Sequence, residues 1–64
     1  MIEIIPGYWI NPTQVLAVYE DEIDKGEIVL SFLGDYCIKN IKPEPGYTVE
    51  QTIRGIVDKI NKNL

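Results

Sequence analysis

The sequence predicts an α+β fold, in which a small antiparallel β-sheet of four to five strands is followed by one C-terminal helix packed on one face. Three observations predict this class. Short apolar runs rich in β-branched and aromatic residues alternate with turn residues as far as position 42. The stretch PEPG (43–46) cannot continue a strand, and the apolar residues beyond it recur with helical spacing. The length predicts a single domain over residues 1–64.

The first two apolar runs predict a short β-hairpin. IEII (2–5) and YWI (8–10) are separated by a Pro-Gly pair (6–7), a dipeptide that favours a turn. The strand then ends at NPTQ (11–14), because proline lacks an amide donor but fits the first position of a helical turn. This segment is therefore predicted to be a brief turn with Asn11 as its cap.

Three further strands are predicted to form a meander. VLAVYE (15–20) leads into the acidic connector DEIDKG (21–26), which ends in a glycine suited to a tight turn. EIVLSFL (27–33) has the composition most typical of a strand. After a compact Gly-Asp turn (34–35), YCIKNIK (36–42) is predicted to return antiparallel to it.

The last segment, TVEQTIRGIVDKINKNL (48–64), predicts an amphipathic helix that follows a type II turn at Pro-Gly 45–46. Thr48 and Gln51 have the spacing of a capping box. Gly55 lies in the helix interior and weakens the helix by about 1 kcal/mol relative to alanine. The face predicted to cover the sheet consists of Val49, Ile53, Ile56, Val57, Ile60 and Leu64.

Composition and charge argue against several classes of function. Ten acidic residues against six basic ones give a net charge of −4 without any basic run, so we expect no nucleic-acid polymer as a partner. No apolar run approaches the ~20 residues of a membrane span, and no signal peptide is recognisable, so we expect no membrane association and a cytoplasmic location. Cys37 is the only cysteine and histidine is absent, which excludes an intramolecular disulfide and the usual nitrogen ligands of zinc.

Both faces of the predicted sheet are apolar, and one helix can cover only one of them. Strand 27–33 has apolar residues on both faces, and the adjacent Tyr8 and Trp9 must also point to opposite sides. One large aromatic ring is therefore expected to stay uncovered, and aromatic residues are common at the centres of protein interfaces. This predicts a homo-oligomer, either a symmetric dimer or a small ring. The alternative is that both rings pack at opposite ends of one core, with Trp9 at its rim.

Three stretches resemble, in their order, the small FlbD-type flagellar proteins and similarly patterned short proteins of bacteria and their phages: YWINPTQVLAVYED, GEIVLSFLGDYCIKN and TVEQTIRGIVDKI. The resemblance covers most of the chain. It consists of the hydrophobic pattern and the short turn after the second strand, without a catalytic or ligand-binding motif. It implies the order strand, turn, strand, gap, strand, turn, strand and helix, and so bears on the fold more than on the function.

Residue types that serve in catalysis or metal binding are scarce. The acidic run at 20–24 suggests a calcium loop, but positions three and twelve of a loop counted from Asp21 are Ile23 and Phe32, which have no oxygen ligand. A solvated hairpin tip is the favoured interpretation. Cys37 lies within a predicted strand, where a small buried thiol is expected. We therefore expect no enzyme activity, no metal and no cofactor.

Two hypotheses for the function remain. The first is a non-catalytic, self-associating interaction module that binds a protein partner. The second is a phage-type sequestering protein that binds a small anionic nucleotide between subunits, with aromatic rings stacked on the base and cations at the phosphate. The candidate residues for partner or ligand binding are Tyr8, Trp9, Tyr47, Arg54, Lys39 and Lys42. In the simpler alternative these residues are core aromatics and solvated cations.

Overall fold

The computed structural model describes residues 1–64 and is α+β, as the sequence predicts. In chain order the elements are β1 (Ile2–Ile5), β2 (Tyr8–Ile10), the 3-10 helix η1 (Pro12–Gln14), β3 (Val15–Glu20), β4 (Ile28–Phe32), β5 (Tyr36–Ile41) and α1 (Val49–Lys62). Every paired strand is antiparallel to its neighbour. The predicted hairpin, meander and C-terminal helix are all confirmed.

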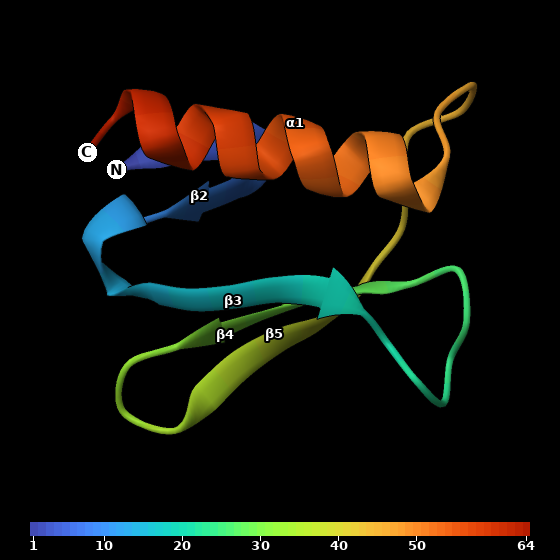
Figure 1. The fold of residues 1–64 in the computed structure, drawn as a ribbon, viewed down its shortest axis with the longest axis horizontal. Helices are drawn as coiled ribbons and strands as arrows, with labels where there is room; N and C mark the ends of the chain where they lie inside the picture. The colour runs from blue at the N-terminus through green and yellow to red at the C-terminus, as the bar shows by residue number, and fades with distance from the viewer.

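The five strands form two sheets rather than one. β1 and β2 make a two-stranded hairpin, and β3, β4 and β5 make a three-stranded meander with β4 in the centre. The predicted turn at 11–14 separates the sheets, with the Asn11 side chain accepting a hydrogen bond from the amide of Thr13 at 3.1 Å. α1 contacts β1 and β3, and the three-stranded sheet lies below the helix and the hairpin (Figure 1).

Two of the predicted turns require a backbone conformation that glycine adopts without strain. In the hairpin, Gly7 has a φ of 87°, and the two-residue loop places Ile5 opposite Tyr8. Before the helix, Gly46 has a φ of 90°, and the amide of Tyr47 donates to the carbonyl of Glu44 at 3.0 Å. Both glycines follow a proline that presets its own φ, as in type II turns.

The core lies where the helix, the hairpin and the inner face of the meander meet. Its nine buried members are Ile4, Ile5, Ile10, Ile28, Leu30, Phe32, Ile41, Ile56 and Ile60. The central strand β4 supplies three of them, because alternate residues of a strand face the same side. Only 11 of the 64 residues are buried, so the core is small even for a domain of this length.

The buried face of α1 differs from the predicted one. Ile56 and Ile60 are buried as expected, but Val57 and Leu64 are exposed, and Thr52 is buried in their place. The helix packs into the angle between β1 and β3 rather than on one flat sheet, which turns its contact stripe toward Thr52. A threonine is tolerated there because its hydroxyl donates to the carbonyl of Thr48 at 2.9 Å.

The capping box predicted at the start of α1 is confirmed. The Thr48 hydroxyl accepts a hydrogen bond from the amide of Gln51 at 3.1 Å, and the Gln51 side chain accepts one from the amide of Thr48 at 2.9 Å. Two amides that have no partner within the helix are thereby satisfied.

Replacing Thr48 by alanine should lower the free energy of unfolding by about 1 kcal/mol, because the first turn loses its side-chain acceptor. The variant Thr48→Ser keeps the hydroxyl and should retain most of that stability. Urea denaturation followed by far-UV circular dichroism measures both variants. An equal loss in the two would show that the hydroxyl does not stabilise the helix.

Candidate functional site

The adjacent rings of Tyr8 and Trp9 lie on opposite sides of β2, as the sequence predicts. Tyr8 pairs with Ile5 and packs against the core. Trp9 pairs with Glu3, and 60% of its surface is exposed. The prediction that one large aromatic remains uncovered is therefore confirmed for Trp9.

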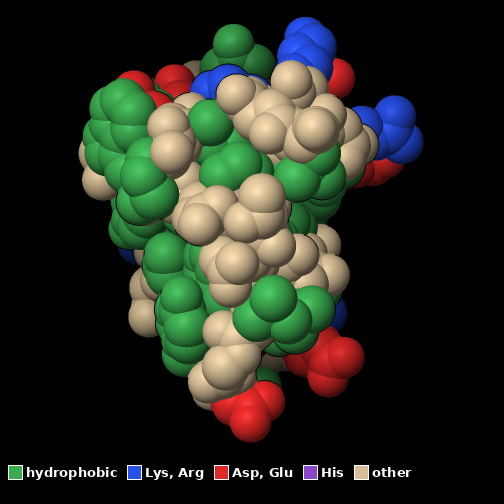
Figure 2. All heavy atoms as spheres, turned by 90° about the vertical axis from the view of Figure 1, so that its left-hand side faces the viewer, with side chains coloured by type: hydrophobic (Ala, Val, Ile, Leu, Met, Phe, Trp, Pro, Cys, Tyr) green, Lys and Arg blue, Asp and Glu red, His purple; other side chains and the backbone are tan.

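Trp9 lines an apolar groove between the end of the hairpin and the end of the meander. The groove has a volume of about 270 Å³ and is lined by Met1, Trp9, Ile10, Asn11, Gln14, Phe32, Tyr36 and Ile38. Tyr36 stacks on Phe32 with ring centroids 5.2 Å apart, which holds its ring in place although 58% of the residue is exposed. No lining side chain is charged. Figure 2 shows this end of the molecule, where hydrophobic side chains lie among uncharged tan atoms and the charged side chains lie around the margins.

Two exposed members of this groove, Met1 and Tyr36, were missed among the candidate residues. The turn predicted at 34–35 would pair Leu33 with Tyr36, whereas the structure pairs Phe32 with Tyr36 across a three-residue loop, so the stack of these two rings did not follow from the sequence. Met1 could not be predicted either, since its place depends on how the two sheets pack together.

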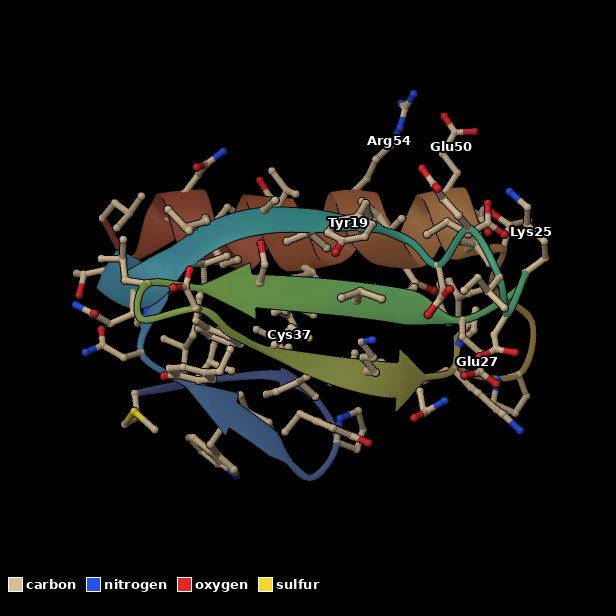
Figure 3. All side chains as sticks on the ribbon, turned by 90° about the horizontal axis from the view of Figure 1, so that it is seen from below. Tyr19, Lys25, Glu27, Cys37, Glu50 and Arg54 are labelled. Atoms are coloured by element: carbon tan, nitrogen blue, oxygen red, sulfur yellow. The ribbon has the colours of Figure 1, made fainter.

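The three candidate cations lie apart from the groove and from one another. The Arg54 guanidinium forms an ion pair with Glu50 at 2.7 Å, and Figure 3 shows both side chains extending from α1 away from the sheets. Lys39 lies on the outer face of the meander, and Lys42 is exposed just after β5. None of these three side chains lines the groove beside Trp9.

The outer face of the meander has a shallow hollow that combines apolar and acidic residues. It is lined by Tyr19, Asp21, Glu22, Ile23, Val29 and Lys39. Backbone amides act on the Asp21 carboxylate, which accepts hydrogen bonds from Asp24 at 3.1 Å and from Ile23 at 2.8 Å. These bonds, that of Asp24 first, hold the pKa of Asp21 below its ordinary value, because they stabilise the charged form. The Asp21 carboxylate therefore remains ionised under mildly acidic conditions.

Cys37 is exposed, and the prediction of a buried thiol is wrong. In the meander Leu30 pairs with Ile38 on the core side, whereas Ser31 pairs with Cys37 on the outer side. Neither the helix nor the hairpin covers that outer face (Figure 3), and Cys37 is exposed there. Val29 lies on the same face but is only 2% exposed, so exposure on this face differs from residue to residue.

Tyr47 borders a third hollow, which lies between α1, β1 and the 43–47 loop. It is lined by Ile4, Ile5, Glu44, Tyr47, Gln51, Thr52, Gly55, Ile56 and Lys59 and has a volume of about 250 Å³. Lys59 was not among the predicted site residues. Its ammonium donates to the carbonyl of Ile4 at 3.0 Å, a contact between the two ends of the chain that no local pattern indicates.

Comparisons with known proteins provide no relative: no protein-family model, curated protein or solved structure matches this chain. The only α-helix, α1, is too short and too polar to cross a membrane. The concave surfaces of the structure are the groove at Trp9, the outer hollow of the meander and the hollow at Tyr47.

Proposed function

We propose that the protein is a non-catalytic interaction module that self-associates through the groove around Trp9 and Tyr36 and binds a protein partner in its assembled form. The observation that supports this most is the groove itself, where exposed aromatic rings surround an uncharged apolar hollow. Contiguous exposed apolar surface on a soluble domain is typical of a contact surface.

A second copy of the same chain is the occupant that the charges favour. The chain has a net charge of −4, so two copies repel each other wherever charged faces meet. No side chain that lines the groove is charged, and the charged side chains at this end of the molecule lie around its margins (Figure 2). Two copies can therefore approach each other here with the least electrostatic repulsion.

The exposed apolar area also fits the centre of a small dimer interface. A buried aromatic side chain covers roughly 150–250 Å², so Trp9 and Tyr36, exposed by 60% and 58%, each offer roughly 90–150 Å². With Met1, which is 78% exposed, the apolar centre reaches roughly 300–400 Å². A standard interface takes about 800 Å² from each partner, with polar residues at its rim, and Asn11 and Gln14 supply such polar groups.

The outer hollow of the meander is the surface that we propose for the protein partner. Tyr19 and Ile23 are exposed there by 45% and 89%, and the two carboxylates of Asp21 and Glu22 outnumber the one lining cation, Lys39. Such a surface suits a partner segment that combines an apolar anchor with lysine or arginine. Binding of that segment should weaken as ionic strength rises, because salt screens exposed charges.

The nucleotide-sequestering alternative needs aromatic rings and cations in one site. No lysine or arginine lines the groove at Trp9, and Arg54 is already paired with Glu50. That function would require a second copy to bring a lysine to the ring, and no observation favours it over self-association.

Light scattering coupled to size exclusion tests the proposal on the native chain over a range of concentrations. We expect a particle of twice 7.3 kDa that returns toward 7.3 kDa on dilution. A lone 7.3 kDa particle that persists at millimolar concentration would contradict self-association. A nucleotide released on heating and found by mass spectrometry would favour the sequestering alternative.

A further inference from the structure

We propose that the hollow between α1, β1 and the 43–47 loop binds a small flat organic molecule with one negative charge. This goes beyond the proposed function, because the groove used for self-association shares no lining residue with this hollow. Gly55, the one glycine of the helix, is among the residues that line this hollow.

Nothing within the chain requires a glycine at position 55. Glycine is the poorest helix former after proline, and Gly55 lies in the interior of a 14-residue helix. Its backbone is not in the left-handed region, and a Cβ built on it meets no atom within 4 Å. The missing side chain instead leaves one wall of the hollow open, since Gly55 is among the lining residues. A residue that lowers the stability of its own helix, although no contact in the chain requires it, is typical of a functional site.

The floor and one wall of the hollow suit a flat apolar body. Ile4, Ile5 and Ile56 are buried and form an apolar floor. Tyr47 is 60% exposed and offers a ring face at the edge. The volume of about 250 Å³ is slightly below the usual range for drug-sized ligands, so a molecule of one or two fused rings is the size that fits.

The polar groups of the hollow select the charge of the ligand. The side-chain carbonyl of Gln51 accepts a hydrogen bond from the Thr48 amide at 2.9 Å, and the Thr52 hydroxyl donates one to the Thr48 carbonyl at 2.9 Å. Neither group is therefore free to bind a ligand through that atom. The Lys59 ammonium uses one donor on the Ile4 carbonyl at 3.0 Å, which holds it beside the hollow with two donors left. An anionic group is the acceptor that such an ammonium binds most strongly.

A single negative charge is preferred over several. Glu44 also lines the hollow, and the chain has a net charge of −4, so a polyanion is repelled. Gln51, Gly55 and Lys59 lie on successive turns of one helix face, a row about 12 Å long. A ring that lies over Gly55 can therefore direct its anionic substituent toward Lys59.

Naphthoate is a suitable probe, with neutral naphthylmethanol as its matched control. We expect saturable binding of naphthoate, with amide NMR shifts concentrated at Thr52, Gly55 and Lys59, and weaker binding of the neutral analogue. Shifts concentrated at the Trp9 groove, or no saturation at millimolar probe, would overturn the proposal.

The variant Gly55→Ala separates binding from stability. It should raise the melting temperature, because alanine favours the helix, and weaken naphthoate binding roughly tenfold, because position 55 lines the hollow and a methyl group there takes space from the ligand. Asn61→Ala is the control, since Asn61 is an exposed helix position outside the hollow, and it should retain full affinity. Unchanged affinity in Gly55→Ala would overturn the proposal, while light scattering of the same variants reports on self-association separately.

A second variant tests the role of the cation. Lys59→Met should weaken the binding of naphthoate while leaving naphthylmethanol little affected, because only the anion uses the ammonium. An equal loss for both probes would show that Lys59 shapes the hollow through its contact with Ile4 and does not recognise charge.

Discussion

Replacing Ile28 by alanine should leave most of the protein unfolded at room temperature. Ile28 is fully buried on the central strand and pairs with the equally buried Ile41. Truncating a buried isoleucine costs about 2–5 kcal/mol, through lost burial and the cavity that remains. A core of this size supplies roughly 3–5 kcal/mol in total. Far-UV circular dichroism and urea denaturation of the variant measure the loss.

Ile23→Ala is the matched control for this prediction. The chemical change is the same, but Ile23 is 89% exposed at the tip of the connector between β3 and β4. We expect its free energy of unfolding to stay within about 0.5 kcal/mol of the native value. Similar unfolding midpoints for Ile28→Ala and Ile23→Ala would contradict the assignment of β4 as the centre of the core.

Replacing Tyr36 by alanine should dissociate the proposed dimer. Tyr36 is preorganised by its stack on Phe32 and presents its ring beside Trp9 in the groove, the arrangement expected of a residue that dominates an interface. Loss of such an anchor costs about 2 kcal/mol or more, which raises the dissociation constant roughly thirtyfold. Light scattering over a dilution series measures this shift, and Trp9→Ala should produce the same result.

Tyr47→Ala controls for the loss of any exposed tyrosine. Tyr47 and Tyr36 are exposed to nearly the same extent, 60% and 58%, but Tyr47 borders the hollow at Gly55 instead of the groove. We expect Tyr47→Ala to remain dimeric and to lose affinity for naphthoate, and Tyr36→Ala to do the opposite. Equal dissociation in both variants would show that the groove is not the interface.

Local patterns in the sequence were sufficient to predict the elements of this fold. Proline and glycine at 6–7 and 45–46 define turns because one presets φ and the other accepts a positive φ. Thr48 and Gln51 define the helix start because a capping box involves residues only three apart. The opposite orientations of Tyr8 and Trp9 follow from the period of a strand. Each of these predictions depends on near neighbours in the chain.

The candidate sites needed contacts between distant parts of the chain. The division into two sheets places α1 in an angle, which buries Thr52 and exposes Val57. The groove joins Trp9 to Tyr36 across that division, and the hollow at Gly55 joins β1 to Lys59. Hydrophobic periodicity states which side of an element is buried, but not which other element covers it, because that choice depends on the combined packing of all the elements. Turns, strands and cap are therefore local consequences of the sequence, while the groove, the hollow and the exposure of Cys37 arise only when the two sheets and the helix pack together.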